Sequence, residues 1–203
     1  MNKGMTSNMA FRLIKFLAAA GMVLMPTVAL AHTGVGNTSG FVDGFGHPIS
    51  GLDHVLAMLI VGVFAWQLGG RALWLVPMTF VGVMAVGGML GVAGIGIPFV
   101  EIGIALSVVV LGAIVAFDVK APIAMAMGVV GLFAMFHGHA HGAEIPENAG
   151  GVAYAAGFMI ATAILHLAGI SIGFLIGTAD KRLVRLAGGL TTVAGVVLLV
   201  GIV

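Results

Sequence analysis

Long apolar segments alternate with short polar or glycine-containing segments along this chain. After the first fifty residues, each apolar segment is close to the roughly 20 helical residues that cross a hydrocarbon core of about 30 Å. No segment shows the alternation of apolar and polar residues that is typical of a strand exposed on one face. We therefore predict an all-α membrane protein, with six transmembrane helices forming one domain over residues 32–203. The predicted spans are about 49–68, 72–92, 99–117, 121–138, 151–177 and 183–203.

The first 31 residues have the pattern of a signal peptide. A positively charged start precedes a short apolar core, which ends in the small-x-small sequence Ala29-Leu30-Ala31. We predict cleavage after Ala31, which leaves His32 as the first residue of the mature chain. The alternative is an uncleaved transmembrane helix, although its apolar core is short for a span. Residues 32–46 are polar and rich in glycine, and they predict a loop outside the membrane.

The basic residues order these spans across the membrane. All five that follow Ala31 fall in linkers that the predicted helices place on a single face of the membrane. Lysine and arginine concentrate in cytoplasmic linkers, so this face is predicted to be cytoplasmic. The mature N- and C-termini are then periplasmic, and the chain lies in a bacterial inner membrane. These residues are Arg71, Lys120, Lys181, Arg182 and Arg185.

Composition agrees with a membrane protein and narrows the chemistry. Of 203 residues, 61% are hydrophobic and 7% charged, whereas about a quarter of a soluble domain is charged. The chain has no cysteine, so thiolate metal sites and iron–sulfur clusters are excluded. It has neither the basic cluster expected for a nucleic-acid partner nor a phosphate-binding glycine loop for ATP. Its expected partners are the lipid bilayer and a divalent metal ion held by nitrogen and oxygen.

The first polar cluster lies where an apolar segment begins. It consists of His47, Asp53 and His54, and ionisable groups at such a place are costly enough to indicate function. On a straight helix the two histidines are about 10 Å apart along the axis, and metal–nitrogen bonds measure only about 2.0–2.1 Å. Either the helix is unwound near Pro48 and Gly51, or the two histidines belong to successive sites. Pro48 suits a first helical turn, which would put His47 at the outer mouth.

Asp53 and His54 point about 100° apart on a helix. The aspartate therefore binds the metal from the flank or supports a ligand through a hydrogen bond. We expect Asp53 and His54 to form half of a site that other helices complete.

The second cluster lies at the outer end of the predicted span 121–138. His137 and His141 are four residues apart, so on a helix they share one face and can chelate one ion. We expect them to complete the site that Asp53 and His54 begin. His139 and Glu144 are additional ligand candidates in the same stretch.

Three further residues are candidates elsewhere in the chain. His166, inside the span 151–177, is either an inner ligand or proton acceptor, or a packed histidine bonded to a neighbouring helix. Glu101 is either an oxygen ligand or an interface charge, and His32 would add its imidazole and free amine. Interhelical hydrogen bonds and a histidine-rich loop explain one buried polar residue well, but not a convergent set.

At these residues the chain resembles the HupE/UreJ family, membrane proteins associated with hydrogenase and urease. The resemblance covers essentially the whole chain. It rests on His47-Pro48, Gly51 and Asp53-His54, on Phe136-His137-Gly138, Ala140-His141-Gly142 and Glu144, and on Leu165-His166 with Gly169-Ile170. It implies a permease rather than an enzyme, with nickel or cobalt as the transported ion and no catalytic cofactor.

Two other functions fit the same residues. One is a membrane-embedded metal-dependent hydrolase, with Asp53 or Glu144 as the base that activates a metal-bound water. The other is an accessory or sensor subunit that binds metal without transporting it. Metal uptake by the purified protein in liposomes separates a permease from both.

Overall fold

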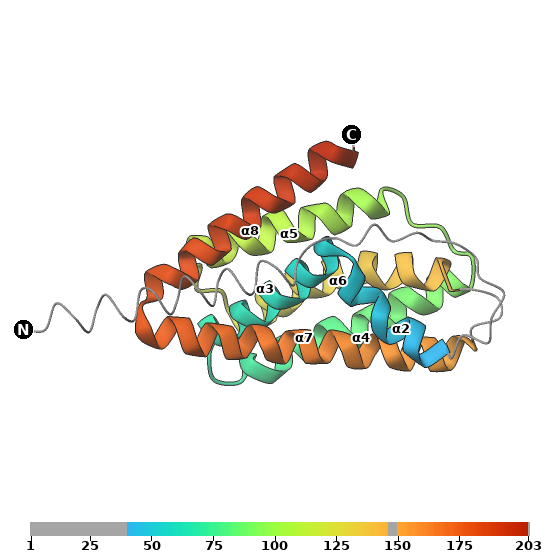
Figure 1. Ribbon diagram of the computed structural model, residues 1–203, viewed down its shortest axis with the longest axis horizontal. Helices are drawn as coiled ribbons and strands as arrows, with labels where there is room; N and C mark the ends of the chain where they lie inside the picture. The colour runs from blue at the N-terminus through green and yellow to red at the C-terminus, as the bar shows by residue number, and fades with distance from the viewer. Residues whose placement is uncertain (1–39, 146–149, 203) are drawn as a thin grey trace, which may run out of the picture. The chain divides into compact units, whose positions relative to one another are not determined.

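The computed structural model describes residues 40–145 and 150–202, and all regular secondary structure in these two ranges is α-helical. The predicted all-α class is confirmed. The described helices belong to one compact unit, Gly36–Val203 (Figure 1). The predicted signal peptide and His32 lie outside the described residues. The helices are α2 (Gly40–Ser50), α3 (Leu52–Leu68), α4 (Ala72–Val92), α5 (Val100–Ala116), α6 (Ile123–Ala143), α7 (Gly151–Ala179) and α8 (Lys181–Ile202).

Four of these helices, α4, α6, α7 and α8, are long and apolar enough to cross a membrane. With 21 residues, α4 is about 31 Å long at 1.5 Å per residue. The pair α2–α3 passes the same test as one span, although it is bent by 81°. Apolar α5 is shorter, at 17 residues. The chain is thus a multi-pass membrane protein with four or five spans by length and composition, and the predicted six are not confirmed.

The bend between α2 and α3 corrects two predictions. The outer loop predicted over 32–46 is wrong from Gly40 onward, because α2 begins there and runs through Pro48 to Ser50. Pro48 therefore lies near the end of α2, not in the first turn of a span. Gly51 is extended, with φ −95° and ψ 123°, and α3 starts directly after it. The straight-helix spacing of about 10 Å does not apply, and the rings of His47 and His54 have centroids 6.3 Å apart.

Helix α2 is held by close packing on α7. A Cβ atom on Gly44 would overlap the backbone carbonyl of Tyr154 in α7, so only glycine allows this approach. Farther along α7, Gly169 meets the carbonyl of Leu59 in α3 in the same manner. In a membrane, the hydrophobic effect does not drive helices together, so their association depends on close packing. Small residues allow this packing because they let the helix backbones approach each other. Helix α7 thereby supports both arms of the bend.

Helices α4 and α6 form a second close pair. A Cβ on Gly138 would overlap the carbonyl of Met84, and one on Gly142 would overlap that of Gly88. Helix α6 continues to Ala143, five residues beyond the predicted end at 138. The histidines at 139 and 141 therefore belong to a helix whose backbone is held directly against α4.

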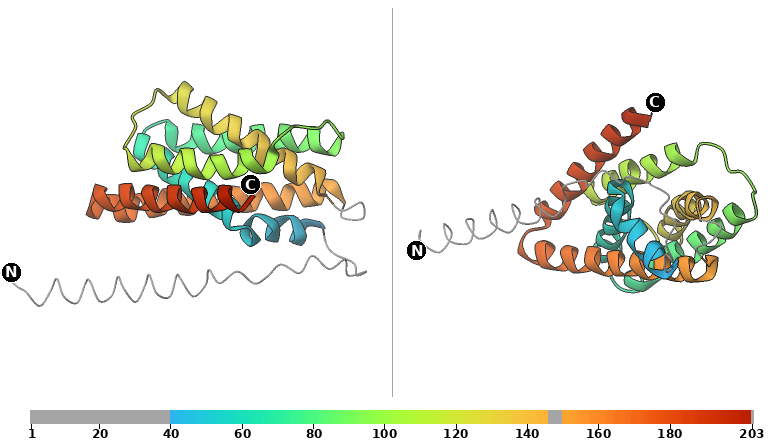
Figure 2. Two further views of the ribbon diagram at one scale, coloured as in Figure 1. Left: turned by 90° about the horizontal axis from the view of Figure 1, so that it is seen from above. Right: turned by 45° about the vertical axis from the view of Figure 1, so that its right-hand side comes forward.

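The third close pair is α5 with α8. A single residue, Asp180, separates α8 from α7, and the right-hand view of Figure 2 shows the two helices diverging from this link. Helix α8 packs on α5 instead.

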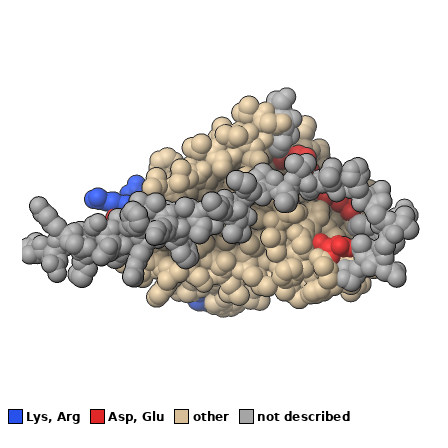
Figure 3. Space-filling view, viewed as in Figure 1, with Lys and Arg blue, Asp and Glu red and all other residues tan. Residues whose placement is uncertain are grey.

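The basic side chains of the described residues gather where α3 and α5 end and where α4 and α8 begin. Figure 3 shows lysine and arginine at the left of one face and most of the visible acidic side chains at the right. Lys120 Nζ donates to Asp118 Oδ1 at 2.8 Å and to the Gln67 carbonyl at 3.2 Å. Gln67 Nε2 also donates to Asp118, and Arg185 Nε donates to the Ala116 carbonyl at 3.0 Å. Hydrogen bonds from Lys120 and then Gln67 lower the pKa of Asp118.

Candidate metal site

Three histidines from two helices converge at the end of the bundle opposite the basic linkers. His54 comes from the first turn of α3, and His137 and His141 come from the last turns of α6. The ring centroid of His54 lies 5.1 Å from that of His137 and 4.5 Å from that of His141. Each of the three residues offers one nitrogen, and these nitrogens lie within 4.8 Å of one another. We call these three residues the inner set.

Asp53 fixes the orientation of His54. Its Oδ1 accepts hydrogen bonds from the His54 ring nitrogen Nδ1 at 2.6 Å and from the His54 backbone N–H at 2.8 Å. A carboxylate can only accept, so Nδ1 carries the proton and the lone pair of the neutral ring is on Nε2. Hydrogen-bonded carboxylates commonly orient metal-binding histidines in this way. The sequence left open whether Asp53 binds the metal itself or supports a ligand through a hydrogen bond. In the structure Asp53 is hydrogen-bonded to His54, which is the supporting arrangement.

Ser107 of α5 fixes the orientation of His137. The Ser107 hydroxyl donates its single proton to the Ile104 carbonyl at 2.6 Å. It therefore accepts from His137 Nε2, which lies 3.0 Å away. The lone pair of neutral His137 is consequently on Nδ1. Ser107 was not anticipated as a site residue, although a single hydroxyl in an otherwise apolar stretch of the sequence was a usable signal; the structure shows that it is fully buried.

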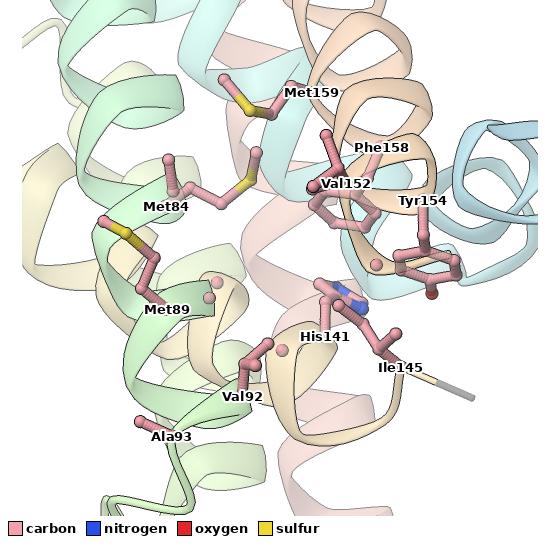
Figure 4. Close-up of a pocket in the computed structure, with 16 residues that line it drawn as sticks. Met84, Met89, Val92, Ala93, His141, Ile145, Val152, Tyr154, Phe158 and Met159 are labelled. Atoms are coloured by element: carbon pink, nitrogen blue, oxygen red, sulfur yellow. The ribbon is translucent and has the colours of Figure 1, made fainter. Parts of the chain in front are cut away.

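His141 has no comparable support. Neither of its ring nitrogens has a hydrogen-bond partner among the described residues, and the same holds for His54 Nε2 and His137 Nδ1. We call these four atoms the unpaired nitrogens. On one side the His141 ring packs on Phe158, with centroids 4.1 Å apart. It also lines an apolar groove of about 540 Å³ between α4, α6 and α7, as Figure 4 shows.

The unpaired nitrogens are the strongest chemical signal in the described part of the chain. A buried polar atom without a partner costs about 1–3 kcal/mol, so such atoms are rare in native structures. Nitrogens bound to a single ion at about 2.0–2.1 Å lie roughly 3–3.5 Å apart. The 4.8 Å limit on the inner set is therefore within reach of that geometry by small side-chain rotations.

A second group of ligand atoms overlaps the first. His47, His141 and Glu144 also offer atoms within 4.8 Å of one another, and we call them the outer set. His47 Nε2 lies 3.8 Å from Glu144 Oε2, and these two side chains are 36% and 57% exposed. The inner set is nearly closed to solvent, with His137 fully buried. The outer set therefore lies at the mouth of the inner one.

His166 lies deeper along α7, apart from both sets. It is buried, and neither ring nitrogen has a hydrogen-bond partner in residues 40–145 and 150–202. Phe80 of α4 packs against it, with centroids 5.0 Å apart, and against His137 at 5.6 Å. An aromatic ring thus contacts both His166 and the inner set. Nothing in the sequence pattern distinguished Phe80 from other apolar residues of its segment.

Two other candidates are placed away from these sets. His139 Nε2 donates to the carbonyl of Ile95, in the linker between α4 and α5, at 2.8 Å. Glu101 is exposed in the first turn of α5. Neither belongs to a cluster of three or more metal-binding side chains in the described ranges.

The chain is similar to a known protein family over most of its length. The chain matches the family model described as HupE / UreJ protein over residues 20–198. It is 48% identical over 188 residues to Protein HupE of Rhizobium leguminosarum bv. viciae, an alignment that covers 92% of this chain and 98% of that relative. No solved structure matches the chain. The chain therefore belongs to the HupE/UreJ family.

Proposed function

We propose that this protein is an inner-membrane permease that takes up Ni²⁺, or Co²⁺, for hydrogenase or urease. The observation that carries the proposal is the inner set of buried histidines, whose unpaired nitrogens converge within a bundle of apolar helices. An ion bound there would offset the cost of burying these atoms without partners. Family membership supports the proposal, because the HupE/UreJ resemblance implies nickel transport.

The ligand chemistry suits a borderline divalent ion. Imidazole nitrogens with a supporting carboxylate bind nickel, cobalt, copper and zinc, whereas hard ions such as Mg²⁺ prefer oxygen ligands. Within such a site nickel binds more tightly than cobalt, and copper more tightly still. Selectivity against copper then rests on geometry and on metal availability. The absence of thiolates in the chain favours release, which a permease needs as much as binding.

The path runs from the outer set toward the basic linkers. His47 and Glu144 collect the ion at the exposed mouth, with His32 of the mature chain as a further ligand. The inner set removes the remaining water, and His166 receives the ion beyond Phe80. The positive-inside rule makes the basic end cytoplasmic, which orients this path inward. In this arrangement the bent pair and α5 complete six spans, the signal peptide is cleaved, and both mature termini are periplasmic.

Uptake of ⁶³Ni²⁺ by liposomes containing the purified full chain tests the proposal. We expect uptake by the wild-type protein and its loss in the variants His54→Ala and His137→Ala. His139→Ala is the matched control, since it removes an imidazole from the same helix as His137 without touching either set. Uptake by His54→Ala and His137→Ala equal to that of wild type would refute the proposed path.

The same experiment separates the other functions. An accessory or sensor subunit would bind Ni²⁺ in detergent but give no uptake in liposomes. A hydrolase would retain one tightly bound metal ion through purification and would likewise give no uptake. A proton gradient applied in parallel samples shows whether uptake is coupled to it.

A further inference from the structure

We propose that His141 is a shared ligand that hands one metal ion from the outer set to the inner set. The inference rests on the proposed function and adds a stoichiometry: the inner and outer sets cannot be filled at the same time, so together they hold one ion. Both sets contain His141, and each is compact enough to surround one ion. The ring of His141 lies 4.6 Å from that of His47 and 4.5 Å from that of His54, so it is nearly equidistant from the two sets.

The chemistry of imidazole makes the two sets exclusive. A neutral imidazole carries a proton on one nitrogen and a lone pair on the other, so it coordinates one ion at a time. Serving both sets at once would require loss of the N–H proton to form a bridging imidazolate. An ion in the outer set therefore leaves the inner set with two histidines, and an ion in the inner set leaves His47 and Glu144.

His141 is also the ligand that can change partner. Asp53 holds His54, and Ser107 holds His137, each through a hydrogen bond to the nitrogen opposite the lone pair. No such bond to His141 is found in the described part of the chain. The ring borders the 540 Å³ groove, which leaves space beside it for rotation (Figure 4). Either nitrogen can then present the lone pair.

The order of the two sets follows from their exposure and ligand type. The outer set is open to water and includes the Glu144 carboxylate, whereas the inner set consists of three largely buried imidazoles. Each set has one acidic group, Glu144 directly and Asp53 through His54. Transfer inward therefore exchanges an oxygen ligand for nitrogen without moving the ion away from a negative charge.

Ni²⁺ binding to the purified full chain in detergent, followed by calorimetry, tests the inference. We expect one Ni²⁺ per wild-type chain. His54→Ala and His47→Ala should each still bind one ion, because each leaves the other set complete. Co²⁺ bound to these two variants should give different visible absorption spectra, because one site contains a carboxylate oxygen and the other does not.

The decisive variants remove His141 from each single variant. Loss of a hydrogen bond behind a metal ligand costs about 10–100-fold in affinity, so loss of the shared ligand should cost at least tenfold in both backgrounds. His141→Leu, which keeps an apolar side chain against Phe158, is used beside His141→Ala to guard against misfolding. His139→Ala is the control on the same helix.

Three results would overturn the shared ligand. The first is two Ni²⁺ per wild-type chain at similar affinity, and the second is complete loss of binding in His54→Ala. The third is an Ni²⁺ affinity of the single variants that does not change when His141 is removed as well. Failure of the proposed function looks different, because the folded wild-type protein would then show no Ni²⁺ uptake in liposomes. Uptake together with two bound ions would reject the shared ligand alone.

Discussion

Replacing Gly51 by alanine should weaken metal binding while leaving the fold intact. A Cβ atom at this position would lie 2.7 Å from Asp53 Oδ1 and 2.8 Å from His54 Nδ1. Ordinary contact begins at 3.4 Å, so the two atoms must move away by about 0.7 Å and 0.6 Å, which are the differences from that limit. The backbone does not oppose the change, because φ −95° and ψ 123° are open to alanine.

The displaced atoms are the two that form the 2.6 Å bond orienting His54. Short side chains relieve such an overlap by rotating. The Asp53–His54 hydrogen bond is therefore broken or lengthened, while the backbone keeps its position. Losing a supporting hydrogen bond of this kind costs about 10–100-fold in metal affinity, or about 1.4–2.7 kcal/mol. Alanine also restricts the unfolded chain, which stabilises the fold by about 0.4–1 kcal/mol where the conformation is compatible.

Calorimetric titration of Ni²⁺ into the purified variant measures the affinity, and thermal unfolding in the same detergent measures the stability. Gly46→Ala is the matched control, because a Cβ on Gly46 meets nothing within 4 Å. We expect the control to bind Ni²⁺ like the wild type. Wild-type affinity in Gly51→Ala would refute the role given to the Asp53–His54 bond. A fall in its melting temperature large enough to account for lost binding would refute the claim that the fold is spared.

Three further substitutions probe other parts of the structure. Ser107→Ala removes the group that accepts from His137 Nε2; we expect about tenfold weaker Ni²⁺ binding, and unchanged affinity by calorimetry would contradict the tautomer assigned to His137. Gly138→Ala forces α6 away from the Met84 carbonyl; overpacking of this kind costs about 1–3 kcal/mol, so the melting temperature and Ni²⁺ uptake should fall together, and a stable, active variant would count against the close pair. Asp118→Asn removes a lowered-pKa carboxylate whose contribution is present at neutral pH and is lost as the pH falls through that pKa; because the side chain is 41% exposed, thermal unfolding should register less than about 1 kcal/mol.

The length of the apolar segments predicted much of the helical framework. The segment predicted at 72–92 coincides with α4, and the one predicted from 151 begins with α7. Four-residue spacing placed His137 and His141 on one face, because successive residues turn by about 100°. By the same rule His139 points about 200° away from each, and its bond to Ile95 lies outside both sets. The sequence alone could therefore have separated His139 from the two histidines of the inner set.

The break at Gly51 is one of the two alternatives that the sequence left open, but the helix α2 that precedes it was not predictable from local pattern. Gly40, Gly44, Gly46 and Pro48 are poor helix formers, so the stretch had the composition of a loop. It is helical because packing on α7 overrides propensity, and that packing depends on an absent Cβ at Gly44. Pairings such as Ser107 with His137, or Phe80 with His166, require knowing which helices are neighbours, and apolar periodicity does not specify this.

The glycine contacts within α4–α6, and between α7 and the bent pair, have a mechanical consequence. Backbones in direct contact resist sliding past one another, so we expect the helices of each group to stay together when the groups move. The two groups divide the ligands between them: His47 and His54 belong to one, and His137 and His141 to the other. A rotation of one group against the other would therefore separate the ligands within each set and free the ion, while the packing inside each group stayed unchanged.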